Sequence, residues 1–131
     1  MAPAGYSQTP LAKKLGIKPG STVHLIGAPP GYRQLLEPLP DDVVFAQTLS
    51  NTTDTIHVFS TKSAELATLL SRVHKKMRPD AVVWVSWPKK ASRVPTDITE
   101  DVVRALALPL GLVDIKVCAV DEVWSGLKLM V

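Results

Sequence analysis

The chain has 131 residues, of which 46% are hydrophobic and 21% charged, a balance that excludes disorder and predicts one globular domain over residues 1–131. The net charge of +3 is too small an excess to make a nucleic acid an expected partner. No apolar run reaches the roughly 20 residues that span a bilayer. With no signal peptide in view and a single cysteine, we expect a cytoplasmic protein without a membrane partner.

The first half of the chain predicts three strands with short connections. Residues 1 to about 10 contain Pro3, Gly5 and Pro10 and are expected to form a loose arm. The apolar runs that follow are bounded by turn residues such as Pro19-Gly20. The predicted elements are short helices over 11–15 and 32–36 and strands over 22–27, 43–46 and 55–60.

The stretch from Ser63 to Trp87 carries the clearest structural pattern. The helix expected from Ser63 to Met77 has five apolar residues on one face, and Pro79 ends it. The strand over 81–87 has no polar/apolar alternation, which is typical of a strand buried on both faces. We therefore expect this strand to be central, with helices covering both faces of its sheet. The five apolar residues are Leu66, Leu69, Leu70, Val73 and Met77.

The last third of the chain predicts one more helix and a hairpin. Asp97 is the expected cap of a helix that ends near Ala107, with Glu100 completing a capping-box pattern. Strands over 113–120 and 124–131 follow, joined by a tight turn. The complete order predicts an α/β fold: a Rossmann-like three-layer sandwich whose mostly parallel sheet of about six strands ends in an antiparallel hairpin.

Several stretches are similar to known proteins. Residues 15–27, residues 69–85 and the terminal hairpin resemble a class I S-adenosylmethionine-dependent methyltransferase. One middle strand–helix unit of that fold is missing, so the resemblance implies a pared-down version of it.

A second resemblance covers nearly the whole chain. It is carried by Tyr6–Leu15, by WPKKAS at Trp87–Ser92, by TDITEDVVR at Thr96–Arg104 and by KVCAVDEVWSGLK at Lys116–Lys128. These phrases resemble a family of small bacterial proteins that is defined only as a domain of unknown function. This resemblance implies no established activity.

The turn after the first strand is the first candidate site, because nucleotide-binding folds place a glycine-rich turn there. Pro29 and Pro30 stand where glycines are wanted, and each removes an N–H donor. The end of the second strand has no acid for ribose hydroxyls, and Gln47 or Asp54 would be a weak substitute. We therefore expect no cofactor, with S-adenosylmethionine disfavoured as the remaining alternative. The ligand-binding candidates in this turn are Gly27, Gly31 and Tyr32.

A second candidate site lies where the third and fourth strands and the hairpin turn end, at the sheet edge where ligands usually bind. It can be read as an anion site in which lysines bind a phosphate or carboxylate beside a tryptophan. It can equally be read as lysines that neutralise the two acids of the hairpin turn. The residues are Lys62, Trp87, Lys89, Lys90, Ser92 and Arg93, with Asp121, Glu122 and Trp124 in the turn. The cations Lys75, Lys76 and Arg78 are expected at the opposite edge, as an ordinary solvated helix end.

The remaining reactive side chains favour structural roles. If Gly27 and Ser60 end adjacent strands in register, His24 and His57 are neighbours on one face, but two imidazoles do not make a zinc site and we expect no metal. Cys118 lies among apolar residues and is expected to be an inert thiol. No acid or nucleophile pattern indicates a hydrolytic centre.

These features favour a non-catalytic binding or regulatory module on a degenerate methyltransferase-like fold. Its expected partner is an anionic small molecule or a protein. The alternative is a small S-adenosylmethionine- or nucleotide-binding enzyme, a methyltransferase with an atypical pocket.

Overall fold

The computed structural model describes residues 9–131, so the expected N-terminal arm lies, up to residue 8, outside the described residues. Within them, six strands form one sheet in the order β2-β1-β3-β4-β6-β5, parallel except where β6 pairs with its neighbours. The strands are β1 (Thr22–Ile26), β2 (Val44–Phe45), β3 (Thr55–Phe59), β4 (Val82–Pro88), β5 (Val113–Ala119) and β6 (Trp124–Met130). The helices are α1 (Leu11–Lys14), α2 (Tyr32–Leu35), α3 (Ser63–Lys76) and α4 (Glu100–Ala107), with 3-10 turns at Lys90–Ser92 and Leu108–Leu110.

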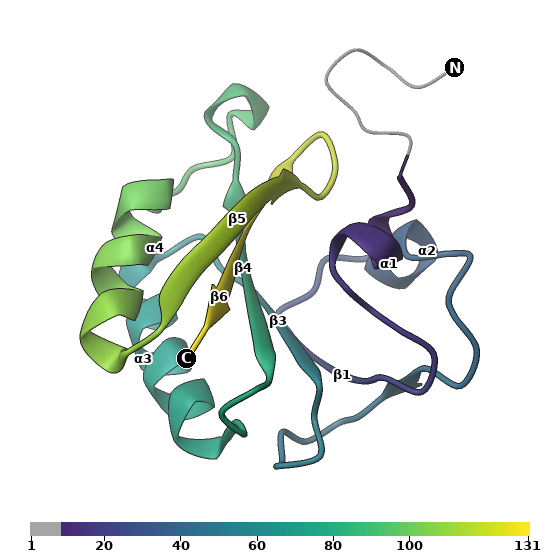
Figure 1. Cartoon of the computed structure of the whole chain (residues 1–131). Helices are drawn as coiled ribbons and strands as arrows, with labels where there is room; N and C mark the ends of the chain where they lie inside the picture. The colour runs from purple at the N-terminus through teal and green to yellow at the C-terminus, as the bar shows by residue number, and fades with distance from the viewer. Residues whose placement is uncertain (1–8) are drawn as a thin grey trace.

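The sheet is covered on both faces, as the sequence predicts (Figure 1). Helices α3 and α4 lie on one face, and the short helices α1 and α2 lie on the other. Two hydrophobic cores result, one on each face of the sheet. Leu66 and Leu70 pack into the core under α3 and α4, while Leu15 and Leu36 pack into the core under α1 and α2. The three-layer Rossmann-like sandwich with a terminal hairpin is therefore confirmed.

Strand β4 occupies the middle of the sheet, between β3 and β6. Val83, Trp84 and Val85 are completely buried, and so is Leu70 on α3. The indole Nε1 of Trp84 donates to the carbonyl oxygen of Leu15 at 3.0 Å, which ties α1 to the sheet. The prediction of a central strand with no exposed face is confirmed, because each face of β4 meets its own helical layer.

The capping of helix α4 differs from the prediction. Thr99, not Asp97, caps α4 through its hydroxyl, which accepts from the Val102 N–H at 3.3 Å. Asp97 instead accepts from the N–H and the hydroxyl of Ser63, both at 2.7 Å, at the start of α3. These hydrogen bonds lower the pKa of the Asp97 carboxyl. Asp97 thus joins the loop before α4 to the first turn of α3.

The predicted pairing of His24 with His57 is wrong by one residue. His24 of β1 is the register partner of Ile56, and His57 is the partner of Leu25. Because neighbouring residues of a strand point to opposite faces, His24 faces the α3 layer, whereas His57 lies buried on the α1–α2 side. The two imidazoles therefore cannot share a ligand.

The connection between β2 and β3 contains no helix in the part of the chain that the structure describes. Residues 46–54 return directly to the sheet, and Asp54 accepts the Thr22 N–H at 2.7 Å. Each of the other parallel connections, from β1 to β2 and from β3 to β4, carries a helix. The α3 face of β1 consequently has no helix of its own, and a groove lies there.

Candidate ligand-binding groove

The groove of about 500 Å³ lies between β1, the loop after β2 and the second half of α3. Small-molecule sites typically measure roughly 300–1,000 Å³. Residues 24–27 of β1 and its end and residues 47–49 of the loop after β2 form one part of its wall. Helix α3 provides the rest, with Leu69, Arg72, Val73 and Lys76. Gly27 and Gln47 lie at or beyond the carboxyl ends of their strands, so one end of the groove reaches the edge where α/β sheets usually bind ligands, and the other reaches the last turns of α3.

The lining is apolar in its walls, with a few polar groups. Ile26, Leu49 and Leu69 are partly buried and pack against the α3–α4 core. Gln47 and Thr48 supply an amide and a hydroxyl from the exposed loop. The Nδ1 of His24 lies 2.9 Å from the carbonyl oxygen of Ala46, which can only accept, so this nitrogen carries the proton. Such a surface suits a flat apolar group that carries hydroxyls.

Two cations border the groove, and sequence reasoning assigned no function to either. Arg72 and Lys76 are exposed, and no ion pair is recorded for them among the described residues. They lie three and seven residues after Leu69, so one face of α3 presents all three. That spacing was visible in the sequence. What the sequence did not show was that this face of the helix meets an uncovered part of β1.

The turn after β1 provides few donors for a cofactor. Gly27 has a φ of +70°, and a Cβ there would lie 2.8 Å from the carbonyl oxygen of Phe59. This glycine is therefore required by the close approach of β3. The N–H of Tyr32 is occupied by the carbonyl oxygen of Pro29, at 3.1 Å, and the two prolines have no N–H.

The first acid after β2 is Asp54, and it is already engaged. Its carboxylate accepts from the Thr22 N–H and pairs with Arg78. The hydrogen bond from Thr22 and the neighbouring guanidinium lower its pKa. The two prolines of the turn after β1 offer no N–H donors, so this turn fits the methionine end of S-adenosylmethionine poorly.

Tyr32, a predicted ligand-binding residue, belongs to a buried hydrogen-bonded network instead. Its hydroxyl lies 2.6 Å from Nδ1 of His57, whose Nε2 lies 2.7 Å from the hydroxyl of Ser86. All three residues are at most 2% exposed. Burial raises the pKa of Tyr32 and lowers that of His57 to about 3. The neutral ring has one donor and one acceptor, and two hydroxyls satisfy both, so the network is structural and is closed to a substrate.

An aromatic cluster extends this network to the hairpin. The His57 ring stacks on Phe59 with centroids 4.1 Å apart, and Phe59 meets Trp124 edge-on at 5.3 Å. The cluster fills the α1–α2 side of the sheet near its carboxyl edge. The Trp124 ring therefore packs against Phe59 in this cluster.

The loop over residues 89–93, here called the lysine loop, lies beside the hairpin turn at 121–124, as the topology predicts. The N–H of Lys89 donates to the carbonyl oxygen of Val123 at 2.7 Å, and its Nζ donates to that of Asp121 at 2.6 Å. The Asp121 carboxylate accepts the N–H groups of Val123 and Trp124, at 2.8 Å each. Ser92 donates its hydroxyl to the Lys89 carbonyl oxygen at 2.6 Å. Loop and turn are thus joined mainly through backbone groups.

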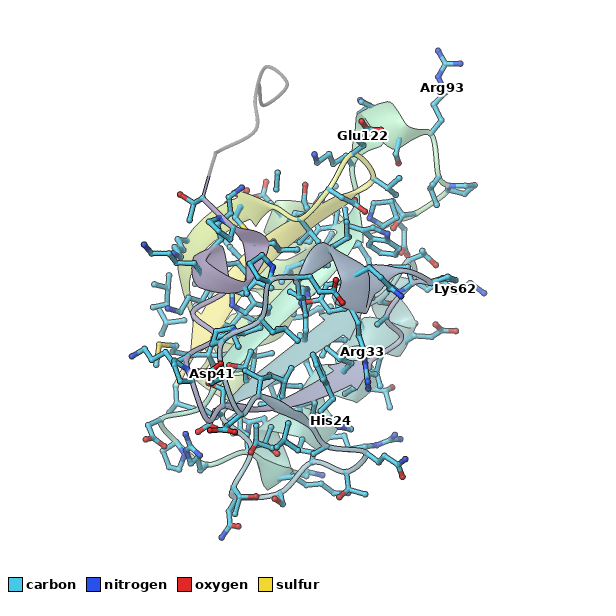
Figure 2. All side chains as sticks on the ribbon, turned by 90° about the vertical axis from the view of Figure 1, so that its right-hand side faces the viewer. His24, Arg33, Asp41, Lys62, Arg93 and Glu122 are labelled. Carbon is cyan, nitrogen blue, oxygen red and sulfur yellow. The ribbon has the colours of Figure 1, made fainter. Side chains whose placement is uncertain are left out.

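A cavity of about 550 Å³ brings together three residues of this predicted site, Trp87, Lys90 and Arg93. Trp87 is buried in the α3–α4 core, while Trp124 packs on the opposite face of the sheet. Figure 2 shows Arg93 and Glu122 at the same end of the molecule, with Lys62 apart from both. Lys90, Lys62, Arg93 and Glu122 are exposed. A ligand-binding role for this loop stays a prediction.

Three other features of the described residues bear on function. No three His, Cys, Asp or Glu side chains gather as metal ligands in residues 9–131. Cys118 is half-buried, and burial raises the pKa of its thiol, which disfavours the reactive thiolate. None of the described helices is both long and apolar enough to cross a bilayer.

Solved structures with a similar fold include several methyltransferases. A SAM-dependent methyltransferase from Aquifex aeolicus is 18% identical, with a TM-score of 0.65 over 92% of this chain and 87% of that one. The N-methyltransferase NodS from Bradyrhizobium japonicum is 14% identical, with a TM-score of 0.59 over 94% and 97%. A ribosomal protein L11 methylase from Lactobacillus delbrueckii is 12% identical, with a TM-score of 0.58 over 91% and 73%.

The sequence itself matches no protein-family model and no curated protein. The resemblance to a small bacterial family therefore stays a prediction. At identities below 20% the structural likeness concerns the fold alone. The chain has the Rossmann-like fold found in S-adenosylmethionine-dependent methyltransferases.

Proposed function

We propose that the chain is a small nucleoside-binding protein of the methyltransferase type, which binds S-adenosylmethionine or a nucleotide in the groove beside β1. The observation that carries the proposal is the position of the groove, which begins at Gly27 and Gln47 at the carboxyl ends of β1 and β2. Nucleotides bind at this edge in doubly wound folds. The similar fold of several methyltransferases supports this alternative over the non-catalytic module that the sequence favours.

The groove offers each part of a nucleoside a suitable partner. Leu49 and Leu69 provide apolar surface for the base, and Gln47 and Thr48 provide hydrogen-bonding groups for ribose hydroxyls. Gln47 is a neutral replacement for the acid that commonly binds ribose in this position. Because Pro29 and Pro30 contribute no donors, we expect the dissociation constant for S-adenosylmethionine to be weaker than about 10 μM, or roughly −7 kcal/mol.

Isothermal titration calorimetry with S-adenosylmethionine, S-adenosylhomocysteine, adenosine and ADP tests the proposal. At least one of these ligands should bind with one-to-one stoichiometry. Gln47→Ala should weaken binding by about 2- to 10-fold, which corresponds to one hydrogen bond of roughly 0.5–1.5 kcal/mol. Gln34→Ala, an exposed glutamine on α2 outside the groove, is the matched control and should bind like the parent chain. Absence of heat with every ligand at millimolar concentration would refute the proposal.

The second candidate function is the non-catalytic binding module. It is favoured by the turn after β1, where Pro29 and Pro30 have no N–H to offer a cofactor and the N–H of Tyr32 is occupied by the Pro29 carbonyl oxygen. This candidate predicts ligand binding without turnover. Formation of S-adenosylhomocysteine from S-adenosylmethionine, in the presence of protein, RNA and metabolite fractions, would decide against it.

A further inference from the structure

We propose that the groove selects ligands that carry a phosphate group, with Arg72 and Lys76 as the residues that bind it. This inference rests on the proposed function and names the class of ligand for the same site. The ligand is then an anionic nucleotide, such as a nucleoside diphosphate, and S-adenosylmethionine binds less well.

The groove is positively charged, which favours an anionic ligand. Arg72 and Lys76 both line it, and no carboxylate does so among the described residues. The ion pairs recorded for cations of the described chain involve Arg78 and Arg104, at other places on the surface. Two uncompensated positive charges favour an anion and disfavour S-adenosylmethionine, which carries a sulfonium and an ammonium group against one carboxylate.

The polar loop and the two cations are placed so that one nucleotide could contact both. The polar loop at Gln47 and Thr48 and the two cations both border the same space of about 500 Å³. A nucleoside that uses the loop would extend its 5′ substituent along β1 towards the last turns of α3. A guanidinium and an ammonium together are a common pair of phosphate ligands. His24, which also lines the groove, keeps its Nδ1 on Ala46 and leaves Nε2 as the ring nitrogen for a ligand.

A simpler explanation is that these cations only complement the negative end of the helix dipole. Lys75 separates the two explanations. It lies in the same last turn and is also exposed, but it does not line the groove. If the helix end attracts anions without a specific site, Lys75 should matter as much as Lys76.

The experiment measures the dissociation constants of adenosine, AMP, ADP and S-adenosylmethionine by calorimetry at two salt concentrations. ADP should bind at least 10-fold tighter than adenosine, and its affinity should fall as salt rises. Arg72→Gln and Lys76→Gln should each weaken ADP binding about 5- to 20-fold and leave adenosine binding unchanged. Lys75→Gln should change neither. Circular dichroism should show each variant folded, since all three side chains are exposed.

The outcomes separate this inference from the proposed function. Equal affinities for adenosine and ADP, or an equal effect of Lys75→Gln and Lys76→Gln, would overturn the phosphate site while nucleoside binding stands. Tighter binding of S-adenosylmethionine than of ADP would do the same. Failure of all four ligands to bind would overturn both.

Discussion

At the scale of single residues, the buried pair of Tyr32 and His57 shows how a polar group becomes structural. A buried polar group without a partner costs about 1–3 kcal/mol, so its hydrogen bonds must be complete. Both nitrogens of the His57 ring have hydroxyl partners, and burial disfavours the charged form of the ring, which lowers its pKa. Its pKa of about 3 therefore has a stability consequence.

The prediction is that His57 makes the protein less stable in mild acid. The pKa is lowered on folding from about 6.5 to about 3, so the unfolded chain takes up the proton first. The stabilisation is complete above pH 6.5 and falls, as pH drops towards 3, by up to about 1.4 kcal/mol per pH unit. Urea unfolding at pH 7.5 and 5.5 should show a larger loss for the parent than for His57→Gln.

The control is His74→Gln, which should keep the pH dependence of the parent chain because His74 is partly exposed on α3. If His57→Gln does not fold, the NMR titration of the parent gives the answer. The His57 ring signals should then stay constant from pH 7.5 to 4.5. A midpoint near 6.5 would contradict the buried neutral ring.

At the scale of elements, the start of α3 depends on an acid from a distant segment. Asp97, 34 residues along the chain, binds the first residue of the helix through two hydrogen bonds. Asp97→Ala should lower the urea midpoint more than Asp101→Ala, whose carboxylate is almost fully exposed and pairs only with Arg104 at 3.3 Å. The double variant Ser63→Ala/Asp97→Ala should lose little beyond Asp97→Ala. Equal effects of the two aspartates would contradict a specific contribution of the Asp97–Ser63 hydrogen bonds.

The Asp97 cap illustrates the difference between features that a local sequence pattern predicts and features that depend on distant segments. The existence and order of the elements follow from local patterns such as the apolar run at Val83–Val85, and these were predicted correctly. The partner of Asp97 and the register of His24 depend on contacts between segments that no local window contains. The groove escaped prediction for the same reason: Arg72 and Lys76 look like a solvated helix end until β1 is placed beside them.

At the scale of the whole molecule, coverage of the sheet is uneven. All residues of the central strand β3 are buried. The edge strand β2 is only two residues long, and neither residue is buried. In the other edge strand, β5, about half of the surface of Val113, Ile115 and Val117 is exposed. Backbone hydrogen bonds open most readily where few contacts cover them. The helical layers therefore stabilise the centre, and we expect the hydrogen bonds of the two edge strands to open more readily.

Hydrogen exchange followed by mass spectrometry tests this organisation and the site together. Amides of β3 and β4 should exchange most slowly, and those of β2 and β5 faster. Saturating ADP should slow exchange at residues 24–27 and 47–49 and at the last turns of α3, because the ligand would cover this flank. The edge strand β5 serves as the internal control and should not change. Protection at 89–93 and 121–124 instead would move the binding site to the lysine loop, because bound ligand protects the segments that it contacts and those whose opening would release it.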